Sequence, residues 1–139
     1  MLRADGLIAV FVASVFAFSA AAQDRDAQPL NPPQPTYPFL AGLFNVEGYC
    51  DVRFAVDEEG LPFGITTSCS QPIFCSEAER AVSRVRFLPM IENGRPTVRG
   101  NIIYPLQFSF PRDSEEEERA VSEQISKQPS EPCREIPVS

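Results

Sequence analysis

Four cysteines and the lack of any histidine limit the chemistry that this chain can perform. The cysteines are Cys50, Cys69, Cys75 and Cys133, and the sequence contains no histidine. A zinc site typically shows paired C-x-x-C or Cys/His spacing, and a dithiol redox site shows C-x-x-C; the sequence has neither. In an oxidising compartment, four such cysteines predict two disulfides rather than a metal site.

Catalysis is not expected from the remaining polar residues. Without histidine, Ser-His, Cys-His and His-metal chemistry are excluded. The adjacent acids Asp57, Glu58 and Glu59 precede a glycine in a predicted turn that should be open to water, so no burial would raise the pKa of a carboxyl there. The sequence therefore predicts a protein that is not an enzyme, with no cofactor and no metal.

The N-terminus has the features of a secretory signal peptide. A short start containing Arg3 leads into an apolar run over residues 7–18, and small residues occupy positions 19–22. This pattern predicts cleavage between Ala22 and Gln23 and export from the cytoplasm. The run is somewhat short for a bilayer core, which needs about 20 apolar residues. The alternative is a retained membrane anchor with the rest of the chain exported.

Size and charge narrow the class of partner. Without residues 1–22 the chain has the size of one small domain. The formal net charge of −7 disfavours nucleic acid, which requires clustered Lys and Arg. We expect a Pro-containing leader at residues 23–33, a folded domain at 34–111 and an acidic tail at 112–139.

Alternating and helical patterns place the elements of the domain. Residues 48–56 and 63–69 alternate apolar and polar residues around a turn that ends in Gly60, which predicts an antiparallel hairpin. A helix with its N-cap at Ser76 is expected to turn Ala78, Ala81, Val82 and Val85 inward. A final strand is expected over residues 102–110.

Two shorter helices complete the predicted architecture. Residues 37–44 space Phe39, Leu40, Leu43 and Phe44 for a short helix packed on the core, and Ser114 with Glu117 fits a capping box that begins a helix in the tail. The fold class is α+β: a small antiparallel three-stranded sheet packed by one main helix in the order β-β-α-β, with a short N-terminal helix.

The hairpin suggests which cysteines pair. If Pro62 lies in the turn and Val56 faces Phe63, then Cys50 lies opposite Cys69 on the inner face, where a disulfide can form. Cys75 would then pair with Cys133 and hold the tail. The rival pairing joins Cys69 to Cys75 and Cys50 to Cys133, and the sequence leaves it open.

The order and spacing of several motifs resemble the C-terminal domain of the TonB energy-transducer family, from Gln34 to about Phe110. These motifs are Gln-Pro-x-Tyr-Pro, Glu-Gly, Val-x-Phe-x-Val, a turn ending in Gly, Arg-Phe-x-Pro and a closing apolar strand. The matching residues are Tyr37, Pro38, Glu47, Gly48, Gly60, Arg86, Phe87 and Pro89.

The resemblance implies a periplasmic domain that takes part in energised transport across the outer membrane. In the family, the domain binds the TonB box, a short segment of outer-membrane receptors, and strand addition at a sheet edge is the implied mode. Pro105 favours an edge position for the last strand. The corresponding partner-binding residues here are Asn101, Ile102, Ile103, Tyr104, Pro105, Leu106, Gln107, Phe108, Ser109 and Phe110.

Two features depart from a complete transducer. A transducer retains an N-terminal helix that contains a histidine and meets an inner-membrane motor, followed by a long Pro-rich spacer. Here histidine is lacking, and an extended leader of about a dozen residues would cover only about 40 Å. The motor is therefore a partner only if the N-terminus is retained. Two alternatives stay open: a homodimer, and a disulfide-stabilised structural adaptor for an unrelated envelope partner.

Overall fold

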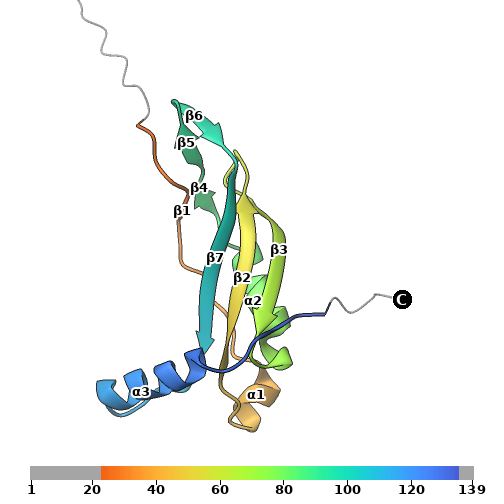
Figure 1. The fold of residues 1–139 in the computed structure, drawn as a ribbon, viewed down its shortest axis with the longest axis vertical. Helices are drawn as coiled ribbons and strands as arrows, with labels where there is room; N and C mark the ends of the chain where they lie inside the picture. The colour runs from red at the N-terminus through yellow and green to blue at the C-terminus, as the bar shows by residue number, and fades with distance from the viewer. Residues whose placement is uncertain (1–22, 135–139) are drawn as a thin grey trace, which may run out of the picture.

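An antiparallel sheet with strand order β7-β2-β3-β8 forms the centre of the domain (Figure 1). The computed structural model describes residues 23–134, so the predicted signal peptide lies outside the described residues. The strands are β2 (Gly48–Val56), β3 (Pro62–Cys69), β7 (Arg99–Phe108) and the short β8 (Glu131–Pro132). The α+β class with antiparallel strands is confirmed, and the sheet has one strand more than the three expected because part of the tail joins it.

Strand β2 is central because every second residue can be buried against a helix. Cys50, Val52 and Val56 are fully buried, whereas the intervening Arg53 is exposed. Helix α2 (Cys75–Ser83) packs on this face with Ala78, Ala81 and Val82. The alternating pattern in the sequence therefore identified both the strand and its inward face.

Both neighbours of β2 carry an extra residue, at adjacent positions along β2. On one side Arg53 pairs with Thr66 and Ala55 with Phe63, which leaves Gly64 and Ile65 opposite Phe54; Gly64 has φ +61°. A glycine with positive φ is typical of a β-bulge. The predicted pairing of Val56 with Phe63 is wrong, because Val56 pairs with Pro62 and the bulge restores the register before Cys69.

The second bulge lies at the start of β7. Phe54 pairs with Ile102 and Val56 with Arg99, so Gly100 and Asn101 together oppose Ala55. Asn101 has φ +53°, a conformation that asparagine tolerates better than most residues. Bulges increase local twist, and these two lie opposite the adjacent residues Phe54 and Ala55 of β2.

Helix α2 begins differently from the prediction. A 3₁₀ turn, η1 (Pro72–Phe74), leads directly into the helix, and the N-cap residue is Phe74, whose backbone is already helical. Ser76 is therefore inside the first turn and does not cap it. The predicted inward residues Ala78, Ala81, Val82 and Val85 are all buried.

The short helix α1 (Phe39–Leu43) does not bury the residues expected to pack on the core. Phe39, Leu40, Leu43 and Phe44 are 80%, 55%, 61% and 71% exposed, and Ala41 is the buried residue of the helix. The apolar spacing correctly predicts a helix. The helix, however, turns Ala41 towards the domain and its large apolar side chains towards solvent.

The leader is part of the fold and is not simply an extended segment in solvent. Its strand β1 (Gln28–Pro29) pairs with β4 (Phe87–Leu88). Arg25 and Ile91 exchange two backbone hydrogen bonds of 3.0 and 2.9 Å. Residues 23–30 therefore lie along the chain that follows α2 and are held mostly by backbone hydrogen bonds. Such bonds do not require apolar side chains at regular spacing, so the sequence shows no pattern for them.

A hairpin of β5 (Met90–Glu92) and β6 (Arg95–Thr97) follows β4. A turn at Asn93 and Gly94 connects its strands, and both residues have positive φ, +52° and +74°. That conformation suits a two-residue hairpin turn of type I′.

The tail crosses the sheet on the face opposite α2. Helix α3 (Glu115–Ser126) begins at Ser114, whose hydroxyl accepts the Glu117 amide, as predicted. Tyr49 donates to the Gln128 carbonyl at 3.0 Å and Ser122 to Gln107 at 2.7 Å. After α3 the chain passes the lower end of the sheet to reach β3 (Figure 1), where β8 pairs with Ser68 and Cys69.

The two turn glycines allow a matched test of the fold. In Gly60→Ala the new Cβ would lie 2.0 Å from the Phe87 carbonyl oxygen at φ +84°, whereas Gly94→Ala has φ +74° and no atom within 4 Å. We expect Gly60→Ala to lower the free energy of unfolding by about 3 kcal/mol or more and Gly94→Ala by about 1 kcal/mol. Urea denaturation followed by circular dichroism measures both; equal losses would contradict this account.

Candidate partner-binding edge

Strand β7 forms one edge of the sheet. It pairs with β2 on one side, and within residues 23–134 no strand pairs with its other side (Figure 1). An edge strand presents unpaired backbone N–H and C=O groups to solvent. This strand contains most of the residues that the sequence indicated as a partner-binding site.

The inward side chains of β7 fix the strand in place. Leu106 and Phe108 are 6% and 2% exposed, and Ile102 and Tyr104 are half-buried against the same core. Ile103, Pro105 and Gln107 alternate with them and are exposed. One face of the strand is therefore held in the core, and the side chains of the other face are exposed.

The regular part of strand β7 is shorter than the predicted residues 101–110. Asn101 belongs to the bulge, and β7 ends at Phe108, so Ser109 and Phe110 lie outside the strand. The Phe110 N–H donates to the Glu47 carboxylate at 2.8 Å, and Arg112 pairs with the same carboxylate. The regular edge therefore comprises residues 102–108, and Glu47 fixes the chain where it leaves the sheet.

The opposite edge of the sheet is partly covered. Strand β8 pairs with Ser68 and Cys69 at one end of β3, and the Cys133 N–H donates to the Thr67 carbonyl at 2.8 Å. The other end of β3 carries the Gly64 bulge. Bulges and short covering strands are common means of blocking an edge, so β7 is the longer regular edge.

The aromatic motif residue Tyr37 supports the end of β7. Its ring centroid lies 6.0 Å from that of Phe108 and 4.9 Å from that of Phe110, and its hydroxyl donates to the Val46 carbonyl. Burial, followed by the nearby Glu47 carboxylate, raises the pKa of Tyr37 above its ordinary value of 10.0. The phenol therefore remains a hydrogen-bond donor at neutral pH.

The motif glycines allow close approaches that a side chain would block. A Cβ on Gly48 would lie 2.5 Å from the Ser70 hydroxyl and 3.0 Å from the Phe74 ring. Gly60 accepts the Phe87 amide at 3.0 Å, and the Phe87 ring packs 5.5 Å from that of Phe54. These residues hold the turn, β2 and β4 together.

The remaining motif residues also have structural positions. Pro38 is the N-cap residue of α1, and the Arg86 carbonyl accepts the Leu30 amide at 2.8 Å. Pro89 separates β4 from β5. The structure therefore places the motif residues at turns, helix starts and strand ends that support the sheet, and not on the outer edge of β7.

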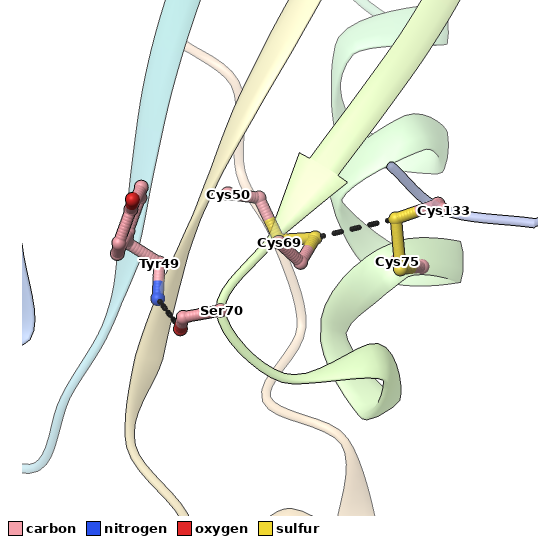
Figure 2. Close-up of a disulfide and its surroundings, with 6 residues drawn as sticks. All are labelled: Tyr49, Cys50, Cys69, Ser70, Cys75 and Cys133. Carbon is pink, nitrogen blue, oxygen red and sulfur yellow. Dashed lines mark hydrogen bonds between the residues drawn. A yellow bond between two sulfur atoms is a disulfide. The ribbon is translucent and has the colours of Figure 1, made fainter. Parts of the chain in front are cut away.

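The disulfides join Cys50 to Cys69 and Cys75 to Cys133, as the favoured pairing predicted, and the rival pairing is wrong. Cys50 and Cys69 are directly paired across β2 and β3. The two disulfides also touch, because the Cys133 sulfur lies 3.6 Å from the Cys69 sulfur (Figure 2). Sequence spacing gave no indication of this contact.

The sulfur atoms of Cys69, Cys75 and Cys133 are the candidate metal ligands among the described residues, and all lie within 4.8 Å of one another. Each sulfur is already committed to a disulfide. Metals bind the thiolate form of cysteine, so the oxidised cluster does not offer those ligands.

An ion pair connects the leader to the start of β7. Arg99 donates to the Asp26 carboxylate at 2.7 Å. This hydrogen bond, followed by one from the Ala27 amide, lowers the pKa of Asp26 below its ordinary value of 3.8. Sequence spacing does not indicate this contact because the two residues are far apart in the chain.

Comparison with protein-family models gives a match over residues 33–110 to the Gram-negative bacterial TonB protein C-terminal family. The chain belongs to this family. The match spans more than half of the chain and includes α1, β2, β3, α2 and β7. A search of the curated proteins found no match.

Membership in the TonB C-terminal family gives the chain a TonB-like role in transport at the cell envelope, in a domain of a type that faces the periplasm. It also suggests interaction with outer-membrane receptors. Among residues 23–134, no helix has the length and apolar character needed to cross a bilayer.

Tyr37→Phe tests the support that this residue gives to the end of β7. Removing the hydroxyl leaves the Val46 carbonyl without this donor, and we expect the free energy of unfolding to fall by about 1 kcal/mol. Because the folded pKa is raised, wild-type stability should fall as pH rises above 10, and the variant should lose part of that slope. Tyr104→Phe is the control, since its hydroxyl has no hydrogen-bond partner among the described residues; an equal effect there would contradict the role of Tyr37.

Asp26 should make the leader contact depend on acid pH. Its folded pKa is depressed, so the stabilisation is present above the unfolded value of about 3.8 and is lost as pH falls through the lower folded value. The protection factors of the Arg25 and Ile91 amides against hydrogen exchange should fall over that range. In Asp26→Asn the protection of these two amides should be low at every pH value. A protection that still falls with pH in this variant, as in the wild type, would contradict the assignment.

Proposed function

We propose that this protein is a periplasmic TonB-like module that binds an extended segment of an outer-membrane receptor, of the TonB-box type, by adding it as a strand to β7. Backbone hydrogen bonds would provide most of the affinity, and alternate side chains would provide the choice of segment. The observation that carries the proposal is the outer edge of β7, with which no strand among residues 23–134 pairs, in a domain of this family.

The exposed side chains of β7 indicate what the added strand would contact. Ile103 is 50% exposed and lies between the exposed Asn101 and Pro105 on the same face of the strand. Side chains of neighbouring strands contact one another across a sheet, typically contributing about 0.2–1 kcal/mol per pair. An apolar partner residue beside Ile103 would therefore favour one register of the segment.

Pro105 supports an edge role and limits the ligand. Proline lacks an N–H and is confined mainly to edge strands and bulges. Here it lies within β7 opposite Asp51 of β2. A partner strand would find no backbone donor at this position. Its backbone hydrogen bonds to β7 would therefore form on either side of Pro105.

The structure of the leader supports a binding module rather than a force-transmitting spacer. Residues 25–30 bind along β4 and β5, so they add little reach between membranes. We therefore propose that the predicted signal segment is cleaved and that the exported form acts by occupying receptor segments. We also propose a binding function without catalysis.

The exposed apolar side chains of α1 favour a second candidate, an adaptor for an unrelated envelope partner. Phe39 and Phe44 are 80% and 71% exposed and belong to one short segment. Clusters of exposed apolar side chains often mark protein interfaces. In this alternative, α1 and not β7 would bind the partner.

Calorimetric titration with synthetic receptor TonB-box peptides tests the proposal. Ile103→Asp places a charge beside the added strand and removes an apolar contact, so we expect about tenfold weaker binding, equivalent to about 1.4 kcal/mol. Thr66→Asp is the matched control, because Thr66 is also exposed but lies on β3. This control should retain wild-type affinity.

Two results would overturn the proposal. One is a lack of binding to every receptor segment at millimolar protein concentration. The other is binding that is weakened by Phe39→Ser but not by Ile103→Asp, which would favour the adaptor function of α1.

A further inference from the structure

We propose that the two disulfides form one thiol–disulfide exchange unit, in which the accessible Cys75–Cys133 bond controls the buried Cys50–Cys69 bond. This inference is independent of the proposed partner. It rests on the 3.6 Å contact between the sulfurs of Cys133 and Cys69 and on the difference in burial between the two disulfides.

The buried disulfide is shielded from solvent. Cys50 and Cys69 are 0% and 3% exposed, whereas Cys75 and Cys133 are half-buried. Exchange requires direct attack of a thiolate on a disulfide sulfur, so access strongly affects its rate. A reductant in solution would therefore reach the Cys75–Cys133 bond first.

The first step transfers two electrons from a dithiol reductant of the thiol–disulfide oxidoreductase class. Its thiolate attacks the Cys133 sulfur and displaces Cys75 as a thiolate. The second thiol of the reductant then displaces Cys133 from the mixed disulfide. The reductant becomes a disulfide, and Cys75 and Cys133 are reduced to thiols with its two protons.

The position of Cys75 favours this direction of attack. Cys75 is the first residue of α2, and a helix N-terminus stabilises a thiolate. A better-stabilised thiolate is a better leaving group in exchange. Cys133 is thereby left as the sulfur that receives the attack.

The second step is internal and needs no further reductant. The Cys133 thiolate attacks the Cys69 sulfur, the Cys69–Cys133 bond forms, and the Cys50–Cys69 bond breaks. Cys50 leaves as a thiolate and takes up the proton that Cys133 lost. Figure 2 shows the Cys133 sulfur on the side of Cys69 away from Cys50, which is the side open to a displacement.

The backbone is already placed for the new bond. Cys69 pairs with Glu131 across β3 and β8, and the Cys133 N–H donates to the Thr67 carbonyl at 2.8 Å. Cys69 and Cys133 are therefore diagonal neighbours, with Cys133 directly after β8. Exchange would keep the tail on β3, release α2 from its covalent link to the tail, and leave a free thiol at Cys50 beside Leu106 of β7.

The variant Cys75→Ser isolates the internal step, because it leaves a free Cys133 next to an intact Cys50–Cys69 bond. After incubation at pH 8, acid quenching, and alkylation in denaturant, peptide mapping should find alkyl label on Cys50 as well as Cys133, independent of protein concentration. The control Cys133→Ser should be labelled at Cys75 and not at Cys50. Label on Cys133 alone in Cys75→Ser would overturn the proposal.

A second measurement uses the wild-type chain and does not depend on how that variant folds. Under limiting dithiothreitol, the Cys50–Cys69 bond should be lost about tenfold faster in the wild type than in Cys75→Ser/Cys133→Ser, where it has no neighbouring thiol. Mapping of the wild-type species with one disulfide should find Cys69 joined to Cys133. Equal rates, together with a one-disulfide species that retains only Cys50–Cys69, would contradict the exchange.

Discussion

The burial of one face of β2 against α2 is the constraint on which the rest of the domain depends. Cys50, Val52 and Val56 are fully buried on this face, and β2 pairs with β7 on one side and β3 on the other. A shift of one residue in a strand would move its apolar side chains to the opposite face. The position of β2 therefore sets the register of both neighbours, including the edge strand proposed to bind a partner.

The motif residues act on the ends of this arrangement. Gly48 allows the start of β2 to approach Ser70 and Phe74 closely, while Glu47 accepts the amide of Phe110 after β7 ends. Gly60 and Phe87 join the hairpin turn to the chain after α2. A recognisable family pattern thus reflects mainly the support of the fold, and the proposed binding edge depends on backbone groups that a sequence pattern does not record.

The two disulfides extend this support to the tail. In the chain-entropy model, closing loops with sequence separations of 19 and 58 residues stabilises a fold by about 3 and about 4 kcal/mol. The first links β2 to β3, and the second ties the tail to α2 after it has crossed the opposite face of the sheet. Their contact makes the covalent framework one connected group of four sulfurs.

The sequence predicted the elements that have a periodic side-chain pattern, and it failed where backbone geometry decides. Strands β2 and β3, the inward face of α2 and the Ser114 cap follow from side-chain spacing. The pairing of Val56 with Phe63 was wrong because the extra residue at Gly64 changes the register. The leader was missed because it pairs through its backbone, and the orientation of α1 depends on packing that its apolar spacing does not specify.

Strand addition at β7 is the central claim, and intermolecular nuclear Overhauser effects test it most directly. Isotope-labelled protein bound to an unlabelled receptor TonB-box peptide should give Hα and amide contacts between the peptide and residues 102–108, in the alternating pattern of adjacent strands. Such contacts confined to the exposed end of β3 or to α1 would contradict the claim.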